Sequence, residues 1–162
     1  MTKLSFIMVF FGFLSLNVMS QSSPTVFDDV QKNALESNKM ILINFSGSDW
    51  CNPCIRMKNE IFSSPVFEEL TREDLLFFNA DFPRMRKNKL SEEMNKQNEG
   101  LAEKYNQKGI FPMTVLINAE GKVLKSWEGY PKMDPVEFVD EIRTILPVEK
   151  AEKKKSTAGP SN

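Results

Sequence analysis

The sequence predicts an α/β domain with a central mixed sheet of four to five strands and helices on both faces. Short apolar runs of strand length alternate with longer segments whose apolar residues recur at helical spacing. This alternation favours parallel strands joined by crossover helices. The four-residue turn at 118–121 is too short for a crossover, so the two strands beside it are expected to form an antiparallel hairpin.

Each element has its own signal in the sequence. Ser64-Pro65 is typical of a helix cap followed by a proline in the first turn. Asp134-Pro135 with Glu137 has the pattern of a capping box. The polar segment 82–100 is expected to be an exposed loop leading into a helix. In chain order, the expected elements are a helix around 27–35, a strand over 40–45, a helix from about 51 past 62, a second helical segment from 65, a strand over 75–80, a helix over 91–107, strands over 113–117 and 122–127, and a helix from 135.

The two ends of the chain differ from the rest. Residues 1–20 have the pattern of a secretory signal peptide, with Lys3 before an apolar run that is shorter than the roughly 20 residues of a membrane span. Cleavage after Ser20 is expected, and an uncleaved anchor is the alternative. The protein would then be exported and act in the periplasm or outside the cell. The domain would cover 21–146, and the Lys-rich segment 147–162 is expected to be a disordered tail.

The composition excludes several function classes. The net charge of -1 and the lack of a nucleic-acid motif give no reason to expect a nucleic-acid partner. The chain has no His, which removes Cys-His and Ser-His nucleophile systems and His metal sites. Two Cys are too few for an ordinary zinc site, although a zinc shared between two chains stays open. We expect no metal, no organic cofactor and a monomer.

The only two cysteines, Cys51 and Cys54, lie directly after a strand, where a helix is expected to begin. The positive end of a helix favours a thiolate at Cys51, and the thiolate is the attacking species. Cys54 lies one turn further along, within reach of the Cys51 sulfur, so it can resolve a mixed disulfide. A purely structural disulfide is one alternative, but so short a loop contributes only roughly 2 kcal/mol of unfolded-state entropy. A chance pair of buried thiols is another, but it would not explain Trp50 and Pro53 around the pair. The spacing therefore favours a redox pair.

The cysteine motif and the residues around it resemble the thioredoxin superfamily, and the resemblance extends over about residues 25–146. It is most similar to exported thioredoxin-like proteins and to the soluble C-terminal domain of transmembrane thiol:disulfide interchange proteins. The resemblance rests on Ile41–Phe45, Asp49–Cys54, Asn79–Asp81 and Gly109–Val115, with Gly121 and Gly129 at the glycine positions of that fold.

The resemblance implies a site and an activity. It implies that Pro112 follows a cis peptide bond opposite Cys51, that the Phe111 backbone pairs with an extended client, and that Trp50 shields the disulfide. A trans proline and a plain core tryptophan are the alternatives. The implied activity is thiol-disulfide oxidoreduction on protein clients, with reduction favoured by analogy. The electrons would come from a separate thiol donor, with a membrane-bound protein as one option.

Three departures from the family pattern affect rate and direction. Asn44 stands closest to the position of a buried Asp that moves protons in reducing thioredoxins, and an Asn cannot take a proton. Water or Asp49 would have to take the proton instead, or no group does. Phe77 stands where the partner Lys is expected, and Asn52-Pro53 replaces Gly-Pro between the cysteines.

Two other functions stay open at this point. A non-catalytic module could bind client peptides or a partner protein on the surface formed by Trp50, Phe111 and Pro112. A peroxidase on the same fold is disfavoured, because neither its activating Arg nor its Thr/Ser-X-X-Cys setting is evident.

Overall fold

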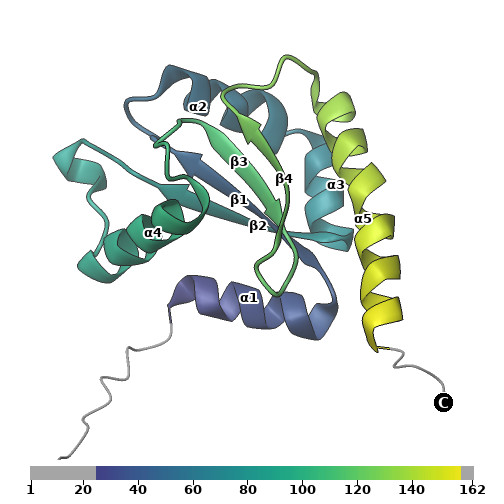
Figure 1. Cartoon of the computed structure of the whole chain (residues 1–162). Helices are drawn as coiled ribbons and strands as arrows, with labels where there is room; N and C mark the ends of the chain where they lie inside the picture. Colours follow the sequence, from purple (N-terminus) through teal and green to yellow (C-terminus); the bar gives the residue numbers. More distant parts are fainter. Residues whose placement is uncertain (1–24, 158–162) are drawn as a thin grey trace, which may run out of the picture.

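A computed structural model describes residues 25–157, with those after Leu146 described by backbone alone. The described chain forms one four-stranded sheet between two layers of helices (Figure 1). In chain order, the elements are α1 (Val26–Ser37), β1 (Met40–Ser46), α2 (Asn52–Met57), the π-helical η1 (Lys58–Phe62), α3 (Pro65–Glu73), β2 (Leu75–Asp81), the 3₁₀ turn η2 (Arg86–Asn88), α4 (Glu92–Tyr105), β3 (Met113–Ile117), β4 (Val123–Glu128) and α5 (Pro135–Thr157).

The sheet has the strand order β2-β1-β3-β4 and is mixed, as the sequence predicts. β1 and β2 are parallel because α2, η1 and α3 cross between them, whereas β3 pairs antiparallel with both β1 and β4. The β3–β4 turn closes with a hydrogen bond from the Gly121 N–H to the Asn118 carbonyl. Gly121 has φ 86°, a left-handed conformation that favours glycine.

Strand β1 is buried along its whole length and divides the interior into two cores. Its residues at 41, 43 and 45 face α1 and α4, and those at 40 and 42 face α2, η1, α3 and α5. The alternation follows from the two-residue period of a strand. Asn44 belongs by this alternation to the α2 side, so a polar side chain stands where the pattern would continue an apolar core.

The predicted capping signals form as expected. Ser64 accepts a hydrogen bond from the Phe67 N–H at the start of α3. Asp134 and Glu137 cap each other's backbone N–H groups at the start of α5. The segment after Cys51 differs from the single helix that was expected, because α2 widens into the π-helical η1. There Ser63 donates both its N–H and its hydroxyl to the Lys58 carbonyl, five residues earlier.

Helix α5 continues to Thr157, where the composition predicts a disordered tail from residue 147. Glu, Lys and Ala have high intrinsic helix propensity, which lets a helix continue without burying apolar side chains. The expected signal peptide at 1–20 and residues 158–162 lie outside the described residues. Within residues 25–157, no helix combines the length and the apolar character that crossing a bilayer requires.

Candidate active site

The site is built around a disulfide between Cys51 and Cys54 at the beginning of α2. Cys51 is the N-cap residue, and its Sγ accepts a hydrogen bond of 3.3 Å from the Cys54 N–H. The two Cα atoms are 5.2 Å apart, and both residues are buried. The Cys51 sulfur therefore lies at the N-terminal end of a helix, where the helix dipole and the Cys54 N–H stabilise negative charge. Asn52 and Pro53, between the cysteines, are exposed.

Trp50, which directly precedes Cys51, belongs to a cluster of three aromatic rings with Phe82 and Phe111. The Trp50 and Phe111 rings meet edge to face at 5.4 Å, and Phe111 meets Phe82 at the same distance. The Trp50 indole N–H donates to the Phe82 carbonyl at 2.7 Å. Phe82, which sequence reasoning did not identify, thus fixes both other rings. These rings line a shallow groove of about 470 Å³, whose wall consists of Trp50, Phe82, Pro83, Arg84, Asn95, Glu99, Gly109 and Phe111.

The Phe111–Pro112 peptide bond is cis, as the resemblance implies. The Pro112 carbonyl accepts a hydrogen bond from the Gly129 N–H at 2.8 Å, which ties this turn to the end of β4. Neither the N–H nor the carbonyl of Phe111 has a hydrogen-bond partner among the described residues. The Phe111 backbone therefore keeps one donor and one acceptor for another chain.

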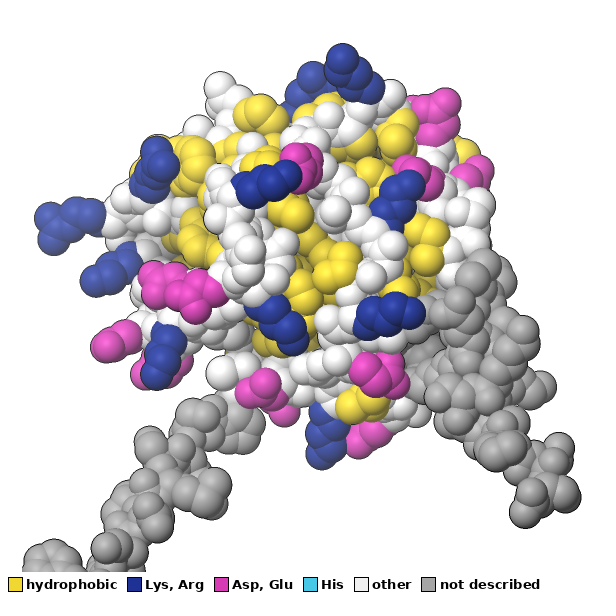
Figure 2. Space-filling model, viewed as in Figure 1, with side chains coloured by type: hydrophobic (Ala, Val, Ile, Leu, Met, Phe, Trp, Pro, Cys, Tyr) yellow, Lys and Arg dark blue, Asp and Glu magenta, His cyan; other side chains and the backbone are white. Residues whose placement is uncertain are grey.

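Asp49 connects the active-site loop to the basic segment that follows β2. Its carboxylate accepts hydrogen bonds from the N–H groups of Arg84 and Met85 and from the Asn88 side-chain amide, each at 2.9 Å. The guanidinium of Arg84 lies 3.8 Å from the centre of the Trp50 ring, in a cation–π contact. In Figure 2, dark-blue side chains project from the left side of the molecule, where Figure 1 places the segment between β2 and α4. Asp49 thus acts in the described structure as a loop anchor.

The Asp49 anchor has an expected pH dependence. The hydrogen bond from the Arg84 N–H, with those from Asn88 and Met85, holds the pKa of the Asp49 carboxyl below its ordinary value of 3.8. A lowered folded-state pKa means that the anchor persists below the ordinary value and is lost as the pH falls through the lowered one. In an NMR titration, the amide protons of Arg84 and Met85 should therefore shift with a midpoint below 3.8. Asp49→Asn is the control and should abolish that titration. A midpoint above the ordinary value of 3.8 in the parent protein would contradict the prediction.

Gly47 is a further site residue that sequence reasoning missed. A Cβ atom at this position would lie 2.3 Å from Cε2 of Trp50, which is closer than such atoms approach. The Gly47 carbonyl also accepts a hydrogen bond from the Cys51 N–H at 2.9 Å. The absence of a side chain therefore lets the indole ring lie against the loop. The only sequence signal was a glycine three residues before Trp50.

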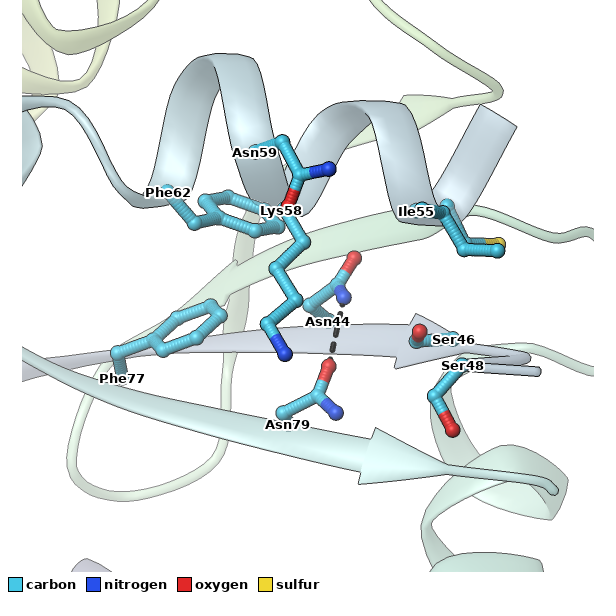
Figure 3. A pocket seen from close by; sticks show the side chains of 10 residues that line it. Asn44, Ser46, Ser48, Ile55, Lys58, Asn59, Phe62, Phe77 and Asn79 are labelled. Carbon is cyan, nitrogen blue, oxygen red and sulfur yellow. Dashed lines mark hydrogen bonds between the residues drawn. The ribbon is translucent and has the colours of Figure 1, made fainter. Parts of the chain in front are cut away.

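Asn44 lies behind the disulfide in a pocket of about 250 Å³ that has both polar and apolar walls (Figure 3). Its amide donates to the Asn79 side-chain oxygen at 2.7 Å, and its own oxygen accepts from the Thr114 hydroxyl at 3.3 Å. The register places Asn79 opposite Asn44, whereas Phe77 lies opposite Leu42. The family resemblance placed Phe77 at the position of the partner Lys. The side chain that bonds to Asn44 is instead that of Asn79. Asn79, like Thr114, could be found only from the strand register.

Within residues 25–157, no group of three or more His, Cys, Asp or Glu side chains is arranged to hold a metal ion.

Comparison with known proteins agrees with this geometry. A model of the thioredoxin-like domain family matches residues 27–145. The disulfide bond reductase DsbH of Chlamydia pneumoniae is 32% identical over 120 residues, which cover 74% of this chain and 70% of that protein. A solved structure of a DsbH oxidoreductase superposes with a TM-score of 0.68 at 29% identity, covering 80% of this chain and 92% of that one.

A more distant structure has the same fold. The oxidised C-terminal domain of Neisseria meningitidis DsbD superposes with a TM-score of 0.50 at 17% identity, covering 74% of this chain and 92% of that domain. The extent of the family match, together with the helix-start cysteine pair and the cis Phe111–Pro112 bond, shows that this chain belongs to the thioredoxin-like domain family.

Proposed function

We propose that this protein is a thiol:disulfide oxidoreductase that reduces protein disulfides outside the cytoplasm. The observation that carries the proposal is the Cys51–Cys54 disulfide at a helix start, with the Cys51 sulfur accepting a backbone N–H. This geometry favours a Cys51 thiolate in the reduced protein. The similarity to proteins named disulfide bond reductase and DsbH oxidoreductase supports the reducing direction.

The proposed reaction moves two electrons in two exchange steps. The Cys51 thiolate attacks one sulfur of a client disulfide, forming a mixed disulfide and releasing the other client sulfur as a thiolate. Cys54 then loses its proton to solvent, and its thiolate attacks the Cys51 sulfur. The bond between Cys51 and the client breaks, the second client thiolate leaves, and both client thiolates take up protons. A separate dithiol protein would reduce the Cys51–Cys54 bond again.

The client would bind across the groove beside the disulfide. We propose that Trp50, Phe111 and Pro112 contact it. An extended client segment would pair with the unpaired N–H and carbonyl of Phe111, and its apolar side chains would contact the Trp50 and Phe111 rings. The exposed Asn52 and Pro53, within the motif, would modulate redox poise.

The location outside the cytoplasm is proposed from the signal-like pattern at 1–20 and from the oxidising compartments in which protein disulfides persist. An exported reductase needs a donor that delivers electrons there, and a membrane-bound thiol protein would meet that need.

The reduction potential of the cysteine pair tests the proposed direction. We expect a value near that of thioredoxin, about -270 mV, and well below the approximately -120 mV of a strong oxidant. The measurement equilibrates the protein, beginning at residue 21, in dithiothreitol buffers and follows tryptophan fluorescence. Reduction of a model protein disulfide is assayed in parallel. A potential above about -180 mV would overturn the reductase assignment in favour of an oxidant or isomerase.

A non-catalytic binding module is the second candidate. The observation that favours it is the amide of Asn44 behind Cys54, since this group cannot accept the proton that resolution releases. In that case the groove lined by Trp50, Phe82 and Phe111 would bind a partner protein, and the cysteine pair would not reduce its disulfides.

A further inference from the structure

The pocket behind the disulfide reaches the buried sulfur of Cys54 from the side of the sheet. One wall is the helix α2–η1, and the other is formed by β1 and the edge strand β2 (Figure 3). Its volume of about 250 Å³ is several times the share of one liquid water molecule, roughly 30 Å³. The lining residues are Asn44, Ser46, Ser48, Cys54, Ile55, Lys58, Asn59, Phe62, Phe77 and Asn79.

Lys58 is the one charged residue in this lining. It follows Cys54 by four positions, and its N–H donates to the Cys54 carbonyl, so the two side chains share a helix face. Figure 3 shows the lysine side chain extending from the helix toward the asparagine pair on the strands. Its ammonium has no hydrogen-bond or ion-pair partner among the described residues. The exposed lysine thus places an uncompensated positive charge at the pocket.

The charged groups on neighbouring segments are engaged elsewhere. Asp81, at the end of β2, accepts from the N–H and the hydroxyl of Ser48. Asp49 accepts from the 84–88 segment. Arg56, on the same helix, pairs with Glu60. None of these four groups is part of the pocket lining, which leaves Lys58 as the cation that shares the pocket with Cys54.

We propose that Lys58 raises the thiolate fraction of Cys54 by holding a positive charge over the pocket through which this buried sulfur exchanges its proton. Its role in catalysis rests on the proposed function, but its effect on the thiol does not. In the resolving step, the Cys54 proton passes through the pocket to solvent, and the Cys54 thiolate then attacks Cys51. Asn44 and Asn79 bond to each other and cannot take that proton, so the lysine favours the step by stabilising the charge that remains.

Titration of Cys54 alone tests the proposal. In a Cys51→Ser background, the ultraviolet absorbance of the thiolate is followed against pH with Lys58 intact and with Lys58→Met. An opposite charge close to a thiol lowers its pKa, and partial exposure of the lysine reduces the effect. We expect Lys58→Met to raise the Cys54 pKa by about half to one unit. At pH values below the pKa, the thiolate fraction should then fall by about three- to tenfold. Alkylation of Cys54 at fixed pH should slow by the same factor.

Two further variants separate charge from packing. Lys58→Arg keeps the charge and should hold the Cys54 pKa within about 0.2 units of its starting value. Lys32→Met removes an exposed lysine from α1, on the opposite face of the sheet, and should leave the titration unchanged. The proposal is overturned if Lys58→Met and Lys32→Met behave alike, or if Lys58→Arg shifts the pKa as far as Lys58→Met does.

The titration also separates this proposal from the proposed function, because it needs neither client nor donor. A Lys58-dependent pKa in a protein that fails to reduce disulfides would leave the electrostatic inference standing and remove the reductase. An active reductase whose Cys54 pKa does not change with Lys58→Met would confirm the proposed function and overturn the electrostatic inference.

Discussion

Cys54→Ser is expected to convert the protein into a trap for its clients. Cys51 keeps its place at the start of α2 and can still attack a disulfide, but the serine hydroxyl cannot resolve the mixed disulfide. Covalent adducts should accumulate at nearly one client per protein. Turnover in the disulfide reduction assay should fall by at least about 10³-fold. Non-reducing electrophoresis with a model protein disulfide gives the adduct, and mass spectrometry locates it on Cys51.

The same experiment distinguishes an enzyme from a binding module. Cys51→Ser is the matched control, because it removes the nucleophile and keeps Cys54; no adduct should form. A binding module would bind its partner equally well with either serine and would form no adduct that dithiothreitol releases. Absence of an adduct with Cys54→Ser, in a protein that folds and keeps its client affinity, would therefore contradict the enzyme assignment.

The fold could be predicted because each element carries a local signal. Apolar periodicity identified α1 and α4, capping residues identified α3 and α5, and the turn ending at Gly121 identified the hairpin. The motif around Cys51 was equally local, because nucleophile, partner and helix start lie within four residues. These features depend on residues that are close together in the sequence, so they can be recognised from one sequence alone.

The rest of the site depends on distant segments. The partner of Asn44 is set by the β1–β2 register, which joins residues 35 positions apart. The stacking of Arg84 on Trp50 depends on how Asp49 holds the loop after β2. The place of Lys58 over the pocket depends on how α2 and η1 pack on the sheet. The first two contacts follow no spacing rule, and the four-residue spacing of Cys54 and Lys58 does not tell which strands complete the pocket, so the sequence showed polar or charged residues without their surroundings.

Asn44→Asp is expected to destabilise the protein and to accelerate the resolving step. Asn44 is 3% exposed, and its amide group now donates to Asn79. A carboxylate there loses that donor and is desolvated, which raises its pKa, while the positive charge of Lys58 in the same pocket offsets part of that rise. A rise of about two units corresponds to a loss of roughly 2.7 kcal/mol in the free energy of unfolding at pH 7. The new carboxyl would in return accept the Cys54 proton, so resolution of the mixed disulfide should become several-fold faster.

The pH dependence gives the sign of the effect. A raised folded-state carboxyl pKa means that the loss of stability is absent below the unfolded-state pKa, about 3.9 for Asp, and complete above the folded-state pKa. Urea unfolding at pH 7 and pH 5 should therefore show a smaller difference from the parent protein at pH 5. Asn59→Asp, at an exposed position of the same pocket, is the matched control and should change stability by less than about 0.5 kcal/mol at both pH values.

With Lys58→Met in the background, so that the lysine cannot stabilise the new carboxylate, a loss as small for Asn44→Asp as for Asn59→Asp would mean that the pocket solvates a carboxylate as well as bulk water does. Solvation of that quality would also screen the charge of Lys58 from Cys54. The Asn44→Asp stability measurement therefore tests the low-dielectric surroundings on which the influence of Lys58 on Cys54 depends.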